Sequence, residues 1–394
     1  MFRRQLLIST RTVLDGRRSL SLSQVQNPLP ASFLRGGTSK GIFLQRSHLP
    51  DSQSEWDPIF LGIMGSPDPV HGRQLNGMGG GVSSLSKICV VGTANASQKS
   101  QGIDVEYTFV QVGIRDSAID YSGNCGNLSS MIGAFALDQG LCSPQRLRDG
   151  VTTIRSFNTN TNKIIETTFP VSETGVPELD ITQASVAGVP GKASQIILDF
   201  VNPSGARTGK LLPTGSPTNQ LDVLGRKITV SLVDATNPSV FVSYEELSQF
   251  LPVDDYIQGK QPALDEVTSA LEDIRQAGAI AMGLDPSAKA QPKIALLSRP
   301  SDGQSDIVVH ALSMGVLHRA VPMTLGLCLG VAAKTEGTIA WNIVQQSKTA
   351  GELVRILHPG GVVEVGAEMG ADGSITSAKV VRTGRRLMVG TVYW

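Results

Sequence analysis

Two apolar stretches, NLSSMIGAFALDQ at residues 127–139 and PMTLGLCLGVAA at residues 322–333, decide how this chain folds. The first has apolar residues at helical spacing, with Gly140 as the expected stop. The second is apolar on every side, which is typical of a helix enclosed by core, and Pro322 suits its first turn. The sequence therefore predicts two helices that are each surrounded by other elements.

Short β-branched runs flank both stretches, bounded by Gly, Pro, Asn or Asp, and they predict strands at residues 105–112, 163–171, 195–201, 227–234, 306–313, 362–369 and 387–394. One further segment, residues 263–282, has apolar residues on one face and charges opposite, so we expect a surface helix there. Each half of the chain thus has strands on both sides of one apolar helix. This pattern predicts an α+β fold of two similar domains, each a β-sheet wrapped around a central helix.

The domain limits follow from length and composition. A chain of 394 residues fits two domains of about 150 to 200 residues each. The Gly/Pro-rich stretch near residues 172–194 is the best boundary. We expect an N-terminal domain at residues 28–183 and a C-terminal domain at 184–380. The last strand, within residues 381–394, is expected to return to the N-terminal domain.

Charge and cysteine usage exclude several classes of protein. Lys plus Arg and Asp plus Glu number 34 each, so no overall field gathers nucleic acid or acidic lipid, and any anion site must be local. No apolar run approaches the roughly 18 residues of a membrane span. The four cysteines and five histidines show no metal-ligand spacing, so we expect free thiols in a reducing compartment and no metal.

The first 27 residues have a different composition. They contain five arginines among Leu, Ile, Val, Ser and Thr, and Asp15 is the only acid. This pattern is typical of a mitochondrial transit peptide. The alternative is a disordered basic tail without an address, which would leave the protein in the cytoplasm.

A cysteine stands directly before the first apolar helix, in DYSGNCGN at residues 120–127. Its glycine neighbours allow a ligand close to the backbone, and the N–H groups of a helix start favour a thiolate and bind anions. Cys125 is therefore a candidate reactive thiol. The alternative is a small side chain that packs quietly beside a glycine-rich helix cap.

Two glycine clusters, RGGTSKG at residues 35–41 and NGMGGGVSSLSK at 76–87, combine backbone N–H groups, hydroxyls and a lysine. Such groups suit a carboxylate or a phosphate. Neither cluster matches the nucleotide-binding loops, and GARTGKL at 205–211 has the wrong spacing for one. A single cluster of this kind is more often a turn than a site, but three in one chain favour a site.

Six ordered motifs resemble the PrpF family of isomerases: FLRGGTSKGIF, GMGGGVSSLSKI, DYSGNCGN, TGKLLPTG, VDATNP and HRA at 318–320. The resemblance extends from about residue 31 to the C-terminus. The family includes 2-methylaconitate isomerase, methylitaconate isomerase, oxalomesaconate tautomerase and an aconitate isomerase. It is similar to diaminopimelate epimerase, in which two domains, each a sheet around a central helix, enclose the active site between them.

The resemblance implies a set of site residues. Cys125 and Lys87 match the catalytic groups, and the residues matched to substrate binding are Thr38, Ser39, Ser84, Ser86, Asn124, Gly126, Asn127, His318 and Arg319. The epimerase uses a second cysteine on its second helix, but here Cys328 comes one residue late, which turns a side chain by about a quarter of a revolution. We therefore expect Cys328 to belong to the core.

The resemblance also implies a reaction without a cofactor, in which a proton moves within a small unsaturated tricarboxylic acid such as 2-methylaconitate or aconitate. Cys125 or Lys87 would remove a proton, and the positive ammonium and helix ends would stabilise the resulting dienolate. The alternatives are an oxalomesaconate-type tautomerase and a non-catalytic carboxylate-binding protein that assists an aconitase-like enzyme. A homodimer is left open.

Overall fold

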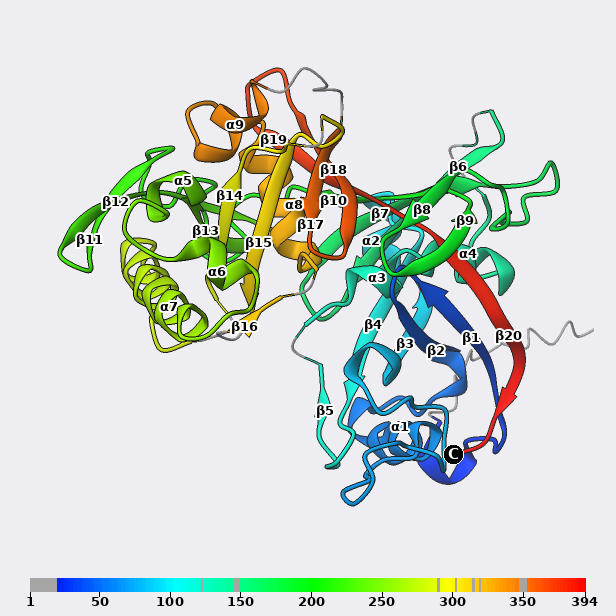
Figure 1. The fold of residues 1–394 in the computed structure, drawn as a ribbon. Helices are drawn as coiled ribbons and strands as arrows, with labels where there is room; N and C mark the ends of the chain where they lie inside the picture. Colours follow the sequence, from blue (N-terminus) through cyan, green and yellow to red (C-terminus); the bar gives the residue numbers. More distant parts are fainter. Residues whose placement is uncertain are drawn as a thin grey trace, which may run out of the picture.

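The computed structural model describes residues 20–394, apart from residues 122, 145–146, 148, 289–290, 302, 314–315, 319 and 347–352. Two lobes lie side by side, one drawn mainly in blue and cyan and the other in green, yellow and orange (Figure 1). In each lobe strands surround an apolar helix, which confirms the expected α+β fold. The limits expected for the two domains stay a prediction, because one sheet continues through both lobes.

The sheet of the N-terminal half is formed, in order across the sheet, by β20 (Gly384–Val392), β1 (Leu29–Gly36), β2 (Ser39–Gln45), β3 (Lys87–Thr93), β4 (Val105–Val112), β6 (Val151–Asn158) and β7 (Lys163–Pro170). The short β5 (Ile119–Asp120) extends beside β4. The predicted strand at 105–112 coincides with β4. Alternating residues of β2 to β4 face the central helices on one side and α1 (Asp57–Met64) on the other.

The sheet of the C-terminal half is formed, in order, by β19 (Ile375–Arg382), β18 (Gly361–Met369), β17 (Leu353–His358), β15 (Ile307–Ser313), β14 (Lys293–Ser298), β13 (Asn237–Ser243), β12 (Arg226–Ala235) and β11 (Asn219–Val223). The short β16 (Val316–Leu317) pairs with β15. A separate hairpin consists of β8 (Ala184–Val186) and β9 (Val189–Ala193).

Two strands join the halves. β10 (Ile196–Val201) lies between β7 and β19 and pairs antiparallel with both. β19 continues through Thr383 into β20, which leaves the C-terminal half and runs along β1, with Leu29 opposite Val392 (Figure 1). The last strand of the chain therefore completes the sheet in which the chain begins.

The central helix of the C-terminal half is α8 (Met323–Ala332), which is buried from Leu325 onward, as its uniformly apolar sequence predicts. The N-terminal half differs from the prediction. Instead of one helix over residues 127–139 it has α3 (Gly126–Ser129) and α4 (Ile132–Asp138). The Ser130 hydroxyl donates to the carbonyl of Asn127 at 2.7 Å, so it competes with the helical N–H donors where the helix breaks.

Helix α9 (Ile339–Val344) packs into the same core as α8. The remaining helices are α2 (Ala96–Ser100), α5 (Tyr244–Leu247), α6 (Val253–Ile257), α7 (Ala263–Ala281) and the 3₁₀ turns Leu22–Gln24, Arg46–His48, Gln53–Glu55 and Ser83–Leu85. The expected surface helix is α7, which buries Val267, Leu271 and Ile274 on one face. No helix in the described part of the chain is long and apolar enough to cross a bilayer.

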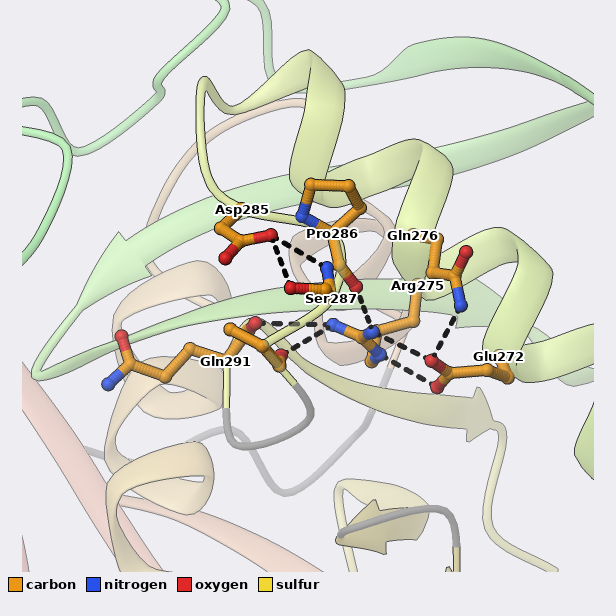
Figure 2. Close-up of polar contacts among 8 residues, drawn as sticks. Glu272, Arg275, Gln276, Asp285, Pro286, Ser287 and Gln291 are labelled. Carbon is orange, nitrogen blue, oxygen red and sulfur yellow. Dashed lines mark hydrogen bonds and ion pairs between the residues drawn. The ribbon is translucent and has the colours of Figure 1, made fainter.

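Arg275 fixes the segment that follows α7. Its buried guanidinium pairs with Glu272 at 2.7 Å and donates to the carbonyls of Pro286, Ala288 and Gln291 (Figure 2). One side chain thus ties the end of the helix to the start of β14. Each donor of this buried cation has an acceptor, which is the usual condition for burying a charge.

The two halves repeat one structural detail. Asp104 accepts the N–H of Arg155 at 2.7 Å where β4 runs parallel to β6. Asp306 accepts the N–H of Arg355 at 2.8 Å where β15 runs parallel to β17. The same contact at the same place in each sheet shows that the halves share one construction.

A row of charged side chains crosses the strands at the junction of the halves. Arg155 pairs with Glu166 at 3.0 Å, and Lys379 pairs with both Asp199 and Glu368. Burial, aided by the nearby charges of Glu166 and Glu368, raises the pKa of Asp199 to about 6. Asp199 is therefore the member of the row whose charged form is disfavoured by its surroundings.

A transit peptide over residues 1–27 would make few contacts with the folded body, but its described part, residues 20–27, does contact it. The N–H of Leu20 donates to Asp51, the N–H of Leu22 donates to Glu55, and the Asn27 amide donates to the carbonyl of Trp394. Residues 20–27 therefore pack on the N-terminal half. Residues 1–19 of the expected transit peptide lie outside the described residues.

Candidate active site

Cys125 is the residue that precedes the first turn of α3, as the sequence predicts. Its thiol is half-buried and points to the hydroxyl of Ser39, with 3.8 Å between the sulfur and the oxygen. Ser39 is buried at the start of β2. The structure thus brings together two predicted site residues that lie 86 positions apart.

The turn between β1 and β2 is held against α3. Gly36 pairs with Ser39, which leaves Gly37 and Thr38 as the two turn residues. Gly37 has φ of +50°, and any Cβ there would collide with the side-chain oxygen of Asn127, so only glycine fits. The Asn127 amide donates to the Thr38 hydroxyl at 3.0 Å. The GGTSKG motif is therefore a tight turn that also builds the site.

A buried hydrogen-bond network supports the loop before Cys125. The Tyr107 and Ser129 hydroxyls lie 2.8 Å apart, and each lies 3.2 Å from the side-chain oxygen of Asn124. Ser129 also donates to the carbonyl of Cys125 at 3.0 Å. Asn124, predicted to bind substrate, uses its side-chain oxygen to hold the loop next to the thiol.

Lys87 lies on the inner face of the sheet, on the same side as Ser39. The inner residues of β2 and β3 alternate with outer ones, and Phe43 and Cys89, both inner, pair in register. The Lys87 side chain is 8% exposed; its ammonium donates to the amide oxygen of Gln111 and lies 5.0 Å from the centre of the Phe109 ring. Its neighbours are thus neutral, and no described carboxylate lies within ion-pair distance of it.

Between the halves lies a cavity of about 340 Å³, which is within the usual range for a small-molecule site. Thr38 and Asn127 line it from the N-terminal half, and Met323 and His358 from the C-terminal half. The hairpin β8–β9 forms a further wall. The cavity is therefore built by both halves and by the segment that joins them.

Two residues of this cavity were missed in the sequence. Arg382, at the end of β19, is 7% exposed and donates from Nε to Asn127 at 3.0 Å. Burial, and then the charges of Arg382 and His318, lower the pKa of His358. A basic residue that ends an apolar strand was the only sequence signal for Arg382, and nothing marked His358.

The starts of the two central helices meet at the cavity. A Cβ on Gly126 would lie 2.5 Å from the sulfur of Met323, the first residue of α8. Pro322 precedes α8 at the position that Cys125 has before α3, so the described structure has a thiol on one side of the junction only. Cys328 is fully buried, donates to the carbonyl of Val233 at 3.5 Å, and has a pKa raised to about 12 by burial. The prediction that Cys328 belongs to the core is confirmed.

The remaining predicted residues are placed less favourably. The Ser86 hydroxyl is buried and donates to Gln74 at 2.6 Å. Neither Ser84 nor Ser86 lines the cavity. His318 is exposed, and its ring nitrogen Nδ1 lies 2.6 Å from the carbonyl of Ala320. The charge of His318 also contributes to the lowered pKa of His358. Arg319 lies outside the described residues.

Comparison with known proteins identifies relatives over almost the whole chain. Residues 26–394 match the family model described as PrpF protein. A 3-methylitaconate isomerase of Eubacterium barkeri is 34% identical over 388 residues, covering 93% of this chain and 97% of the relative. A 2-methyl-aconitate isomerase of Shewanella oneidensis is 34% identical over 404 residues, with the same coverage of both chains.

A solved structure agrees with these relatives. The crystal structure of a methylitaconate-delta-isomerase is 33% identical to this chain and superposes with a TM-score of 0.81. The superposition covers 93% of this chain and 95% of the other. The arrangement of the two halves is therefore shared with a known isomerase.

Proposed function

Because the chain belongs to the PrpF family, we propose that it is a cofactor-independent isomerase that moves a proton within a small unsaturated tricarboxylic acid such as 2-methylaconitate or aconitate. The observation that carries this proposal is the contact between the Cys125 thiol and the Ser39 hydroxyl, which do not line the cavity but adjoin its lining residue Thr38. A binding protein for carboxylates needs hydroxyls and cations, but it has no use for a thiol placed in this way.

The reaction requires one proton to leave and one to arrive. A base removes the C–H proton next to the conjugated double bond, and the charge spreads onto the carboxylate oxygens as a dienolate. A proton is then delivered to the far allylic carbon, so the formula is unchanged. Cys125, as thiolate, removes the first proton, and Lys87 or the Ser39 hydroxyl supplies the second. The reverse assignment of Cys125 and Lys87 is the alternative.

The surroundings of Lys87 support its role. Its ammonium is buried beside an amide and an aromatic ring, so water screens its charge little. A fixed cation in such a site stabilises a developing negative charge more than it would in water. Lys87 does not line the cavity itself, but it shares the inner face of the sheet with Ser39 and therefore with the thiol.

Proton NMR tests the proposal directly. The protein is incubated in D₂O with cis-aconitate, 2-methylaconitate or oxalomesaconate, and the positions of the vinyl and methylene protons are followed. We expect isomerisation of an aconitate-type substrate with exchange of deuterium at the allylic carbon. Turnover of oxalomesaconate alone would instead identify a tautomerase. Binding without exchange of any substrate proton would identify an accessory carboxylate-binding protein and contradict the proposal.

Two further proposals concern the whole protein. The arginine-rich composition of the first 27 residues supports mitochondrial localisation, which a fluorescent fusion of the full chain tests against the same fusion lacking residues 1–19. Residues 20–27 are kept in that comparison because they contact the folded body. We also propose a homodimer, supported by the apolar side chains of Leu387 and Val389 exposed on β20, and light scattering of the purified protein tests it.

A further inference from the structure

Arg382 is a buried cation that no described carboxylate pairs with. Its side chain is 7% exposed, lines the cavity between the halves, and lies within ion-pair distance of no carboxylate among the described residues. Burying an unpaired charge opposes folding, so proteins rarely retain one unless another charge pairs with it. Among the described residues Arg275 is the other arginine as deeply buried, and it has its partner in Glu272. Burial lowers the pKa of Arg382, and among the described residues the Cys125 thiol is the group whose charge would favour protonated Arg382 and raise its pKa, so a carboxylate partner must come from a ligand in the cavity.

The guanidinium is also oriented. Nε donates to the Asn127 side chain at 3.0 Å, and Nη1 donates to the carbonyl of Val381 at 2.8 Å. Nη2 has no hydrogen-bond partner among the described residues. An arginine held at one edge and unpartnered at the other can bind a carboxylate with two parallel hydrogen bonds at little cost in side-chain entropy.

Among the described residues that line the cavity, Arg382 is the buried cation. Lys192 and Glu364 also line it, but both are exposed and of opposite sign. The lowered pKa of His358 favours a neutral ring. The Thr38 oxygen already accepts from Asn127, so its hydroxyl hydrogen is left to donate to a ligand.

We propose that Arg382 is a specificity-determining residue that binds one carboxylate of the substrate, with Asn127 holding the guanidinium and Thr38 donating to the same anion. This inference rests on the proposed function for the identity of the ligand. It assigns the discrimination between tricarboxylates and dicarboxylates to a single arginine on the strand that joins the halves.

Calorimetry with tricarballylate, a saturated tricarboxylate that cannot isomerise, tests binding apart from catalysis. We compare the unchanged protein with Arg382→Met, Arg382→Lys and the control Arg386→Met, which removes an arginine paired with Asp138 outside the cavity. The loss of a hydrogen-bonded ion pair should weaken tricarballylate binding by roughly 10- to 100-fold in Arg382→Met. Arg382→Lys should lie between, and Arg386→Met should bind normally.

Two dicarboxylates then identify the carboxylate. Glutarate lacks the central carboxylate of tricarballylate, and methylsuccinate lacks one terminal carboxylate. The dicarboxylate that lacks the group bound by Arg382 should bind the unchanged protein and Arg382→Met equally well. The other dicarboxylate should bind Arg382→Met more weakly than the unchanged protein. If Arg382→Met weakens both to the same degree as tricarballylate, the residue acts on overall charge, and the specific pairing is overturned.

Thermal unfolding separates a binding role from a structural one. Without ligand, Arg382→Met should unfold at the same temperature as the unchanged protein or higher, because an unpaired buried charge is removed. With saturating tricarballylate, only proteins that keep Arg382 should gain their full increase in melting temperature. A variant that unfolds early and binds tricarballylate normally would overturn the inference. Tight binding of tricarballylate by a protein that isomerises nothing would leave it standing and remove the proposed function instead.

Discussion

The Cys125 thiol and the Ser39 hydroxyl lie 3.8 Å apart, one before the first central helix and the other at the start of a strand. Replacing the sulfur by oxygen keeps the size of the group but makes it a far weaker acid. We expect Cys125→Ser to bind tricarballylate within a few-fold of the unchanged protein and to lose turnover by at least roughly 100-fold. Steady-state kinetics and calorimetry measure the two effects.

The matched control is Cys328→Ser, because Cys328 is buried in the core of the other half. It should retain turnover and lose about 1 kcal/mol of stability, as expected for a polar replacement in a core that offers one carbonyl acceptor. Loss of turnover in Cys328→Ser together with its survival in Cys125→Ser would show that the reactive thiol has been misassigned.

Gln111→Glu tests the charge of Lys87 without altering the lysine. The new carboxylate would lie where the amide oxygen now accepts from the ammonium, so a buried ion pair should form. Neutralising the cation should reduce its stabilisation of the dienolate, and we expect kcat to fall by roughly 10- to 100-fold. Gln111→Met removes the acceptor but leaves the cation unpaired, and it should retain more turnover than Gln111→Glu. Equal kcat in the two variants would argue against a charge role for Lys87.

Gly126→Ala tests the contact between the two helix starts. The added Cβ would lie 2.5 Å from the Met323 sulfur, so the Met323 side chain must move or one of the halves must shift. A displacement near 1 Å is enough to lower turnover by roughly 10- to 100-fold. The double variant Gly126→Ala, Met323→Ala relieves the collision and should recover most of the lost kcat. Failure of the second substitution to improve kcat would mean that the glycine is needed for another reason.

The raised pKa of Asp199 predicts how the stability of the folded protein depends on pH. Its pKa is raised to about 6, above the value of about 3.9 in an unfolded chain, so the folded state binds the proton more tightly. Its contribution is therefore fully favourable below pH 4 and is lost as the pH rises through 6. Relative to the unchanged protein, Asp199→Asn should gain roughly 2 kcal/mol at pH 8 and little at pH 4. Melting temperatures across this range measure the difference, and a pH-independent difference would contradict the assignment.

The sequence predicted the strands and the second central helix well because both depend on local patterns. Residues 105–112 alternate apolar and polar groups, and residues 322–333 are apolar throughout. The break after Ser129 was not predictable in this way, because Leu128, Ile132 and Phe135 keep helical spacing across it. The break depends on the Ser130 hydroxyl, which donates to the carbonyl of Asn127. The spacing of apolar residues does not encode such a bond.

The site shows the same limit. Cys125 was found from its place before an apolar helix and Ser39 from its match to a family motif, and the fold brings them into contact. Arg382 was missed because its environment is made by Asn127 and by the burial at the junction of two halves. Ser86 was expected at the substrate because its motif resembles the family's, and its hydroxyl donates to Gln74, twelve positions earlier.

The path of β20 has a consequence for the order in which the protein can fold during synthesis. Domains usually fold from the N-terminus onward as they leave the ribosome. Here β1, which emerges early, gains its outer partner from residues 384–392, which are made only after the whole second half. Its edge stays open throughout translation of the second half. The sheet of the N-terminal half is therefore completed only after the second half has been translated.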